Sequence, residues 1–505
     1  MKKIVLGLSL LSSFSGVVAQ TGHDIRINFK NAKDTVMYLA FYQFDKSYIA
    51  DTCKKVVKGN VVFKGKNSLD KGVYYVVSQE KGRYFDFFIS DKNQNITITT
   101  DTNQMVKNLR SPNSKENNDF FDYIRFITNK NHEFTDLRAK TKGLTAKDSA
   151  AFINEKARDM NVSVNDFEKS FVEGHKGTFV ADVINLKMEK EAKDIPKASN
   201  GRPDSIFIYN YYKNHYWDGV NFKDDGIMRT PFFADRVKKF FNNIIVQHPD
   251  TVNIEIDRMM SKTVPGSTMH KFLLAYFTPT YESSKVMGFD KVFVHIIDNY
   301  FKTGQAKGIY EEATIENIIK RGEVLKPLLL GNKAPDLLMI DTIGHKSIAK
   351  MGFDTVKTSA GATKLYYDNV EKLAQVFTPL YGVKADYLVL VFWDVDCGHC
   401  KTEIPKLIKE YHDLKNEKYD VKVFSVYTQQ DYDKWRRYII ENKLDWINIY
   451  DGVHINNIKD KYDIYSTPVI YVLDKNKVIK AKRIGTEQVK EVIKNMERES
   501  KSDKK

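Results

Sequence analysis

One short stretch near the C-terminal end constrains the fold of this chain more than any other. Residues 388–392 are a run of apolar side chains, typical of a strand buried on both faces of a parallel sheet. The sequence Cys397-Gly-His-Cys400 follows, and apolar residues then recur at helical spacing from Ile404 to Tyr411. The pattern therefore predicts a buried strand, a turn that carries two cysteines, and a helix.

Cys397 falls at the predicted start of that helix. Unpaired backbone N–H groups and the helix dipole favour a thiolate there, and a thiolate is the form of cysteine that attacks disulfides. A C-x-x-C pair can also bind zinc, but the sequence has no second cysteine pair and no histidine pair at zinc-finger spacing. We therefore favour redox chemistry, expect neither a metal nor an organic cofactor, and keep a metal or structural use of the pair as the alternative.

Further features surround the cysteine pair. They are a tryptophan that ends the strand, a glutamate and a proline in the pattern C-x-x-C-x-x-E-x-P, and a Thr-Pro pair before a second apolar run: Trp393, Glu403, Pro405, Thr467 and Pro468. Together they resemble the active site of the TlpA/ResA-like thiol–disulfide oxidoreductases, which are thioredoxin-fold proteins of bacterial envelopes. The resemblance covers roughly residues 331–495.

This resemblance implies a C-terminal α/β thioredoxin fold with a protein-binding site. In the family the proline is cis and faces the active-site sulfurs, so Thr467 and Pro468 are expected to bind substrate, together with Trp393. The substrates implied are protein thiols or disulfides, and an upstream redox partner of unknown identity would recharge the site.

Two positions depart from the family pattern. Asp396 stands where the family usually has tryptophan, and Val391 stands where some thioredoxins carry a buried acid that transfers protons. Asp394 and Asp396 flank the cysteines, and negative charges there should raise the pKa of the Cys397 thiol, opposing the helix dipole.

The chemistry suggests a role for each residue of the pair and its neighbours. Cys397 is expected to be the attacking thiolate and Cys400, one turn into the helix, the cysteine that resolves the mixed disulfide. His399 can favour the thiolate when protonated, or it can be a solvated loop residue. Glu403 can pass protons to and from the thiols if it is partly buried, or it can simply suit the first turn of a helix.

The N-terminal residues 1–19 read as a secretory signal peptide. Two lysines precede an apolar run that ends in small residues, and this run is short and broken by serines, unlike a membrane anchor. We therefore expect an exported protein of the periplasm or cell envelope, without a transmembrane segment after cleavage. The net charge is +14, but the lysines are interspersed with acids along the chain and are not gathered in one block. This indicates a solvated surface, and export disfavours nucleic acid as a partner.

The composition and length predict several folded domains. The chain has 505 residues, of which 42% are hydrophobic and 12% aromatic, so it exceeds one hydrophobic core. Short strands are predicted at residues 34–41, 60–63, 72–77, 85–89 and 95–99. Helical spacing follows them. We expect a small β-sandwich at 20–113, an all-α domain at 114–330, the thioredoxin-like domain at 331–495 and a charged tail at 496–505.

Finer predictions cover the thioredoxin-like domain. Its first strand is expected at 337–341, with a short partner strand at 346–348 and an extended helix plus loop at 351–385. After the cysteines, the expected order is strand 421–427, helix 431–442, strands 469–473 and 478–484, and a closing helix from Glu487.

Two features outside this domain leave alternatives open. Cys53 could be a reactive or resolving thiol, although a half-buried small hydrophobe is the simpler interpretation. Residues 209–231 are rich in aromatic side chains and could line a ligand groove or, more simply, pack between helices.

Three functions are compatible with the sequence. The leading one is an exported thiol–disulfide oxidoreductase acting on protein thiols. The second is an envelope interaction module, in which the upstream domains bind a partner and the thioredoxin-like domain is an accessory. The third, a peroxidase, usually requires a cysteine in a Pro-Thr-Cys context, which no cysteine of this chain has.

Overall fold

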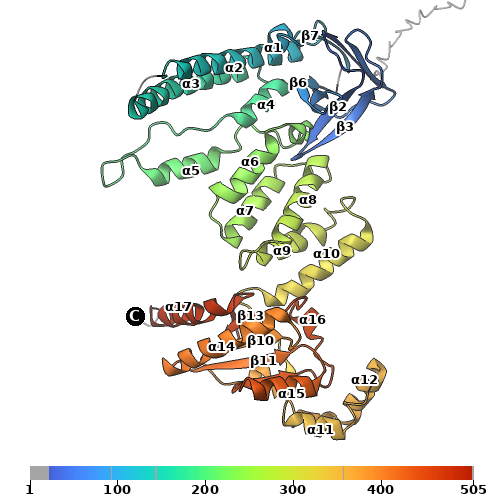
Figure 1. Cartoon of the computed structure of the whole chain (residues 1–505), viewed down its shortest axis with the longest axis vertical. Coiled ribbons are helices and arrows are strands. Elements are labelled where there is room, and N and C mark those ends of the chain that lie inside the picture. Colours follow the sequence, from blue (N-terminus) through green and yellow to red (C-terminus); the bar gives the residue numbers. More distant parts are fainter. Residues whose placement is uncertain (1–21, 92–93, 143–144, 357, 503–505) are drawn as a thin grey trace, which may run out of the picture. The chain divides into compact units, whose positions relative to one another are not determined.

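The computed structural model describes residues 22–91, 94–142, 145–356 and 358–502 (Figure 1). The predicted signal peptide lies outside the described residues. The chain folds into two compact units. The first holds the residues up to Gln247 and the stretch Ser261–Met269, and the second holds His248–Met260 and the residues from His270 onward.

The first unit begins with two β-sheets, which confirms the predicted β-rich region. One sheet has the order β4-β1-β7 and the other the order β3-β2-β5-β6. The strands are β1 (His23–Lys30), β2 (Met37–Gln43), β3 (Lys46–Cys53), β4 (Asn60–Gly65), β5 (Gly72–Val77), β6 (Arg83–Ile89) and β7 (Asn95–Asp101). Along β1 buried apolar residues alternate with charged or polar ones, so one face of the sheet packs inward.

Two of these strands escaped prediction. β1 reads as a mixed polar segment because its inward residues are single positions between charged ones. β3 is exposed over its first four residues and pairs with β2 at the edge of its sheet. Such strands depend on their partners more than on their own hydrophobicity.

Helices follow the sheets, as predicted. In the first unit they are α1 (Met105–Asn108), α2 (Lys115–Ala139), α3 (Ala146–Gly174), α4 (Phe179–Lys187), α5 (Ser205–His215), the 3-10 turn η1 (Asp225–Arg229), α6 (Phe233–Lys239) and the π turn η2 (Phe240–Ile244). Ser114, Thr145, Thr178 and Asp204 cap the N-termini of α2 to α5 with their side-chain oxygens.

The aromatic stretch at 209–231 forms a packing cluster. Tyr216 and Phe222 are buried, and the rings of Tyr216 and Trp217 lie 5.2 Å and 5.3 Å from that of Phe240. The simpler of the two interpretations therefore describes these rings.

The second unit starts with further helices. They are α7 (Pro249–Met260), α8 (Thr268–Glu282), α9 (Asp290–Ile296), the π turn η3 (Ile297–Phe301), α10 (Glu312–Leu325) and the 3-10 turn η4 (Lys326–Leu328). None of the helices within the described part of the chain is long and apolar enough to cross a membrane.

A seven-stranded mixed sheet completes the second unit and has the order β14-β13-β10-β11-β12-β8-β9. Its strands are β8 (Leu338–Asp341), β9 (Thr378–Pro379), β10 (Tyr387–Trp393), β11 (Val421–Tyr427), β12 (Ile447–Tyr450), β13 (Val469–Asp474) and β14 (Ile479–Lys482). The helices are α11 (Gly344–Lys350), α12 (Ser359–Asp368), α13 (Val370–Ala374), α14 (Gly398–Asn416), α15 (Tyr432–Glu441), α16 (Ile458–Lys461) and α17 (Val489–Ser502), with 3-10 turns η5 (Leu380–Gly382) and η6 (Thr486–Gln488). This mixed sheet with its helices agrees with the predicted thioredoxin fold.

Local differences from the predictions have physical causes. The predicted strand at 346–348 is part of helix α11 instead, because the Asp341 carboxylate accepts hydrogen bonds from the backbone N–H groups of Ile343 and Gly344 and turns the chain into a helix. Strand β12 was not predicted; it forms by pairing with β11 on one side and β8 on the other.

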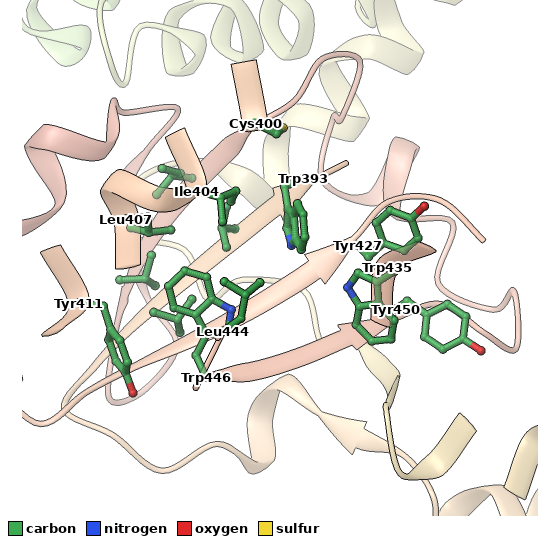
Figure 2. Packing of buried hydrophobic residues seen from close by; sticks show 14 of the residues in the cluster. Trp393, Cys400, Ile404, Leu407, Tyr411, Tyr427, Trp435, Leu444, Trp446 and Tyr450 are labelled. Carbon is green, nitrogen blue, oxygen red and sulfur yellow. The ribbon is translucent and has the colours of Figure 1, made fainter. Parts of the chain in front are cut away.

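Strand β10 lies at the centre of the core. It runs parallel to β11 and antiparallel to β13, and every one of its side chains is buried. Val389, Val391 and Trp393 belong to one hydrophobic cluster, shown in part in Figure 2, whereas Leu388 and Leu390 belong to the other. Since both faces of the strand are packed, the turn that follows it starts from a fixed position.

A buried hydrogen bond inside this core gives a first testable prediction. Trp393 Nε1 donates to Ser425 Oγ at 2.7 Å, and both side chains are buried. Ser425→Ala should lower the free energy of unfolding by about 1–3 kcal/mol, because it leaves an indole N–H without a partner in the core. Chemical denaturation would measure this loss. As the control, Ser466→Ala at an exposed serine should change stability by no more than about 0.5 kcal/mol, and an equal loss in both variants would contradict the prediction.

Candidate active site

The turn after β10 places Cys397 at the start of helix α14. The Asp394 carboxylate accepts a hydrogen bond from the backbone N–H of Asp396 at 2.9 Å, and the Asp394 carbonyl accepts one from the N–H of Cys397 at 3.3 Å. Cys397 is the N-cap residue of α14, so its sulfur lies by the free N–H groups of the first helical turn. The sequence prediction of a cysteine at a helix N-terminus is correct.

A loop that is distant in sequence contacts this cysteine. The Thr467–Pro468 peptide bond is cis, as predicted, and the Cys397 thiol donates a hydrogen bond to the Thr467 carbonyl oxygen at 3.2 Å. Because that carbonyl carbon is bonded to the proline nitrogen, Pro468 lies beside the sulfur. Strand β13, which begins directly after this proline, pairs with β10 and so brings the two segments together.

The environment of Cys397 favours its thiolate. The side chain is half-buried, and burial by itself would raise the pKa. Hydrogen bonds from the Thr467 side chain, the Cys400 thiol and the backbone N–H groups of Cys400 and His399 outweigh burial and bring the pKa of Cys397 below its ordinary value. A thiolate therefore forms more readily at this position than on a free cysteine.

The second cysteine has the opposite environment. Cys400 is 1% exposed, and burial raises the pKa of its thiol to about 11. Its hydrogen bond with Cys397 raises the pKa further, because the proton is best held on Cys400 while Cys397 carries the charge. Both cysteines are free thiols in the structure. The thiolate therefore forms more readily on Cys397 than on Cys400.

His399 and Glu403 are less involved than the sequence suggested. The side chain of His399 is exposed, and it is its backbone N–H that contributes to the low pKa of Cys397. The Glu403 carboxylate is 25% exposed and pairs with Lys406 Nζ at 2.7 Å; this pair and the Thr486 hydroxyl lower its pKa. A carboxylate held in its ionised form is a poor proton donor, which favours the simpler role of Glu403 at a helix start.

The two aspartates do not act on Cys397 as expected. Asp396 Oδ1 and Oδ2 pair with Lys434 Nζ at 2.5 Å and 2.7 Å, and Asp394 accepts a hydrogen bond from Gln429 at 3.1 Å. Neither aspartate is among the main influences on the pKa of Cys397, whose net shift is downward. Lys434 is a site residue that the sequence did not reveal, since nothing in its neighbourhood on α15 marks it.

Trp393 needs a correction. Its side chain is 0% exposed and hydrogen bonded to Ser425, so it cannot contact a bound protein in this structure. It supports the end of β10 from within the core. Val391 is also buried in β10, so the site has no acid at that position.

Two further candidates for a site apart from the cysteine pair are a metal centre and the third cysteine, Cys53. Within the residues that the structure describes, no group of three or more histidine, cysteine or acidic side chains could hold a metal ion. Cys53 is a buried free thiol in the first unit, and its Sγ donates to the Lys55 carbonyl oxygen at 3.6 Å. It matches the simpler interpretation as a small buried hydrophobe.

Comparison with protein families assigns three parts of the chain. The model of the AhpC/TSA family matches residues 372–482, which contain the cysteine pair. Two domains of unknown function, DUF4369 and DUF5106, match residues 23–120 and 154–318. None of the curated proteins matches the chain.

Several solved structures are similar to this chain. A domain of a possible thiol-disulfide isomerase from Cytophaga hutchinsonii is 35% identical, with 35% of this chain and 98% of that chain covered and a TM-score of 0.27. A thioredoxin-like protein from Bacteroides caccae is 19% identical, with 60% and 98% covered and a TM-score of 0.41. A thiol:disulfide interchange protein from a Bacteroides species is 20% identical, with 33% and 88% covered and a TM-score of 0.24.

The first of these relatives is similar enough in sequence to decide the family, because almost all of its length is covered at 35% identity. Together with the match to the AhpC/TSA family, it shows that the chain belongs to the thioredoxin-fold thiol–disulfide oxidoreductases.

Proposed function

We propose that this protein is an exported thiol–disulfide oxidoreductase that exchanges disulfides with protein thiols through Cys397 and Cys400. The observation that carries the proposal is the contrast between the two sulfurs. Cys397 is accessible and has a lowered pKa, whereas Cys400 is buried with a pKa of about 11. This is the asymmetry that a two-step exchange requires.

The steps follow from these positions. The Cys397 thiolate attacks one sulfur of a substrate disulfide, which breaks that bond, forms a mixed disulfide and releases a substrate thiolate that takes up a proton. Cys400 then loses its proton and attacks Cys397 Sγ, which forms the Cys397–Cys400 disulfide and releases the second substrate thiol. Two electrons pass to the substrate, and the reverse sequence oxidises a dithiol.

The test uses the chain without residues 1–19. The reduced protein should lose two thiols when oxidised and regain them with dithiothreitol, and it should reduce insulin with dithiothreitol as the electron source. Its reduction potential decides the direction: about −270 mV indicates a reductant, and roughly −120 to −180 mV an oxidase or isomerase. A protein that neither forms the internal disulfide nor reduces insulin overturns the proposal.

Export is part of the same proposal and is tested separately. The support is the charged, apolar and small-residue pattern of residues 1–19. Mass spectrometry of the protein recovered from the cell envelope should give a mature N-terminus at Gln20. Recovery of the uncleaved chain from the cytoplasm would contradict export without affecting the redox chemistry. We also propose the domain boundaries 20–113, 114–330 and 331–495. The charged tail predicted at 496–505 starts within helix α17, which continues to Ser502.

A substitution of His399 should change the reduction potential of the Cys397–Cys400 pair. His399→Pro removes both the imidazole and the backbone N–H that lowers the pKa of Cys397. The reduced form should therefore be less stabilised, and the reduction potential should fall by tens of millivolts, where 30 mV corresponds to about 1.4 kcal/mol. Equilibration with glutathione measures this change.

His399→Ala is the matched control, since it removes the imidazole and keeps the N–H. A fall in both variants assigns the effect to the imidazole, and a fall only in His399→Pro assigns it to the backbone. An unchanged potential in His399→Pro would show that neither group stabilises the thiolate.

A further inference from the structure

A groove lies beside the reactive cysteine. It has a volume of about 370 Å³ and includes Thr467, whose carbonyl oxygen contacts Cys397. The residues that line it include Thr428, Gln429, Ile458, Lys459, Tyr465 and Thr467. A protein that forms a mixed disulfide with Cys397 has to place the chain on either side of its own cysteine next to this loop.

One wall of the groove is an exposed aromatic ring. Tyr465 is 63% exposed, so its ring is accessible to a protein bound at Cys397. Two cations hold the ring: Lys459 Nζ lies 5.4 Å from the ring centroid, and the Arg321 guanidinium lies 5.6 Å from it. At an exposed site such contacts are weakly attractive, which favours this orientation of the ring.

Arg321 also anchors the segment that carries this tyrosine. It comes from helix α10, before the thioredoxin-like domain, and pairs with Asp463, whose side chain is 1% exposed. Arg483 pairs with the same carboxylate and donates a hydrogen bond to the Asp463 carbonyl oxygen at 2.7 Å. Two arginines on one buried carboxylate hold residue 463 firmly, only four positions before Thr467.

We propose that Tyr465 forms a specificity wall for protein substrates and that Arg321, through Asp463 and the tyrosine ring, is the residue that positions it. The helical segment before the thioredoxin-like domain thereby takes part in substrate recognition without touching the cysteines. This inference rests on the proposed function and adds the site that distinguishes a protein disulfide from a small one.

The experiment compares a protein and a small disulfide as substrates. Tyr465→Ala and Arg321→Ala should raise the KM for insulin about three- to tenfold, since the first removes the wall of the groove and the second removes the residue that positions it. The kcat for insulin, and the rate with the small disulfide 5,5′-dithiobis(2-nitrobenzoate), should stay within about twofold of wild type, because the groove is not needed by a ligand that small. Arg321→Lys, which keeps a charge near Asp463, should recover part of the KM.

The control is Lys320→Ala, which removes the exposed neighbour of Arg321 on the same helix and should change neither constant. Because Tyr465 is exposed, Tyr465→Ala carries the test if Arg321→Ala does not fold. An unchanged KM in Tyr465→Ala, or an equal loss with both substrates, overturns the inference. A wild-type protein that reduces neither substrate overturns the proposed function as well, so the two failures are distinguishable.

Discussion

Cys397→Ser should abolish insulin reduction, leaving a rate indistinguishable from that of dithiothreitol alone. A serine hydroxyl is almost fully protonated at neutral pH and cannot form a disulfide, so the first exchange step has no nucleophile. The buried Cys400 cannot substitute, because its side chain is 1% exposed and its thiol has a pKa of about 11. Insulin turbidity followed over time, with the variant at the concentration of the wild type, measures the effect.

Two further variants complete this test. Cys400→Ser keeps the attacking thiolate but not the resolving one, so it should accumulate mixed disulfides with insulin that are visible on non-reducing gels. Cys53→Ala should keep full activity, since Cys53 is buried in the first unit. Insulin reduction by Cys397→Ser would show that the attacking sulfur has been assigned wrongly.

Iodoacetamide should label Cys397 at least a hundredfold faster than Cys400 near pH 7. A thiol of pKa about 11 is ionised in only one molecule in ten thousand at that pH, and burial further restricts access to it. Cys397 has a pKa below that of an ordinary thiol and is half-exposed. Peptide mapping of the reduced protein after brief alkylation gives the ratio of the two rates.

The pH dependence of this labelling has a defined sign. Only the thiolate reacts, so the rate at Cys397 should rise with pH and level off above its pKa, which lies lower than for a free cysteine. Glutathione labelled under the same conditions is the reference, and its rate should level off at a higher pH. A Cys397 curve that coincides with that of glutathione, or comparable labelling of both cysteines, would contradict the electrostatic description of the site.

Much of the fold could be predicted because its strongest elements carry their own signal. Residues 388–392 are apolar on both faces and lie within β10, and strand β11 has the predicted bounds 421–427. Weak elements could not be predicted in the same way. Strand β12 is held by its neighbours β11 and β8, and α11 forms because of the side chain of Asp341. The decisive interactions of β12 are with distant strands, whereas α11 depends on a local side chain to backbone turn that hydrophobic spacing does not reveal.

The same distinction between local patterns and distant contacts applies to the candidate site. The cysteine pair, the helix start and the cis proline carry a sequence pattern, and the structure places Cys397 beside Thr467 as expected. The charges were misjudged, because the pairing of Asp396 with Lys434 joins positions 38 residues apart. Likewise, the position of Arg321 at Asp463 depends on how α10 packs, which no local pattern indicates.

The pairing of β10 with β13 also determines at what stage of synthesis the site can form. Cys397 and Thr467 are 70 positions apart, and only the antiparallel contact between these two strands brings them together. A chain that emerges from the ribosome therefore displays both cysteines well before the loop that completes their surroundings. The helix start can lower the pKa of Cys397 on its own, but the contribution of Thr467 arises only when the C-terminal hairpin has joined the sheet.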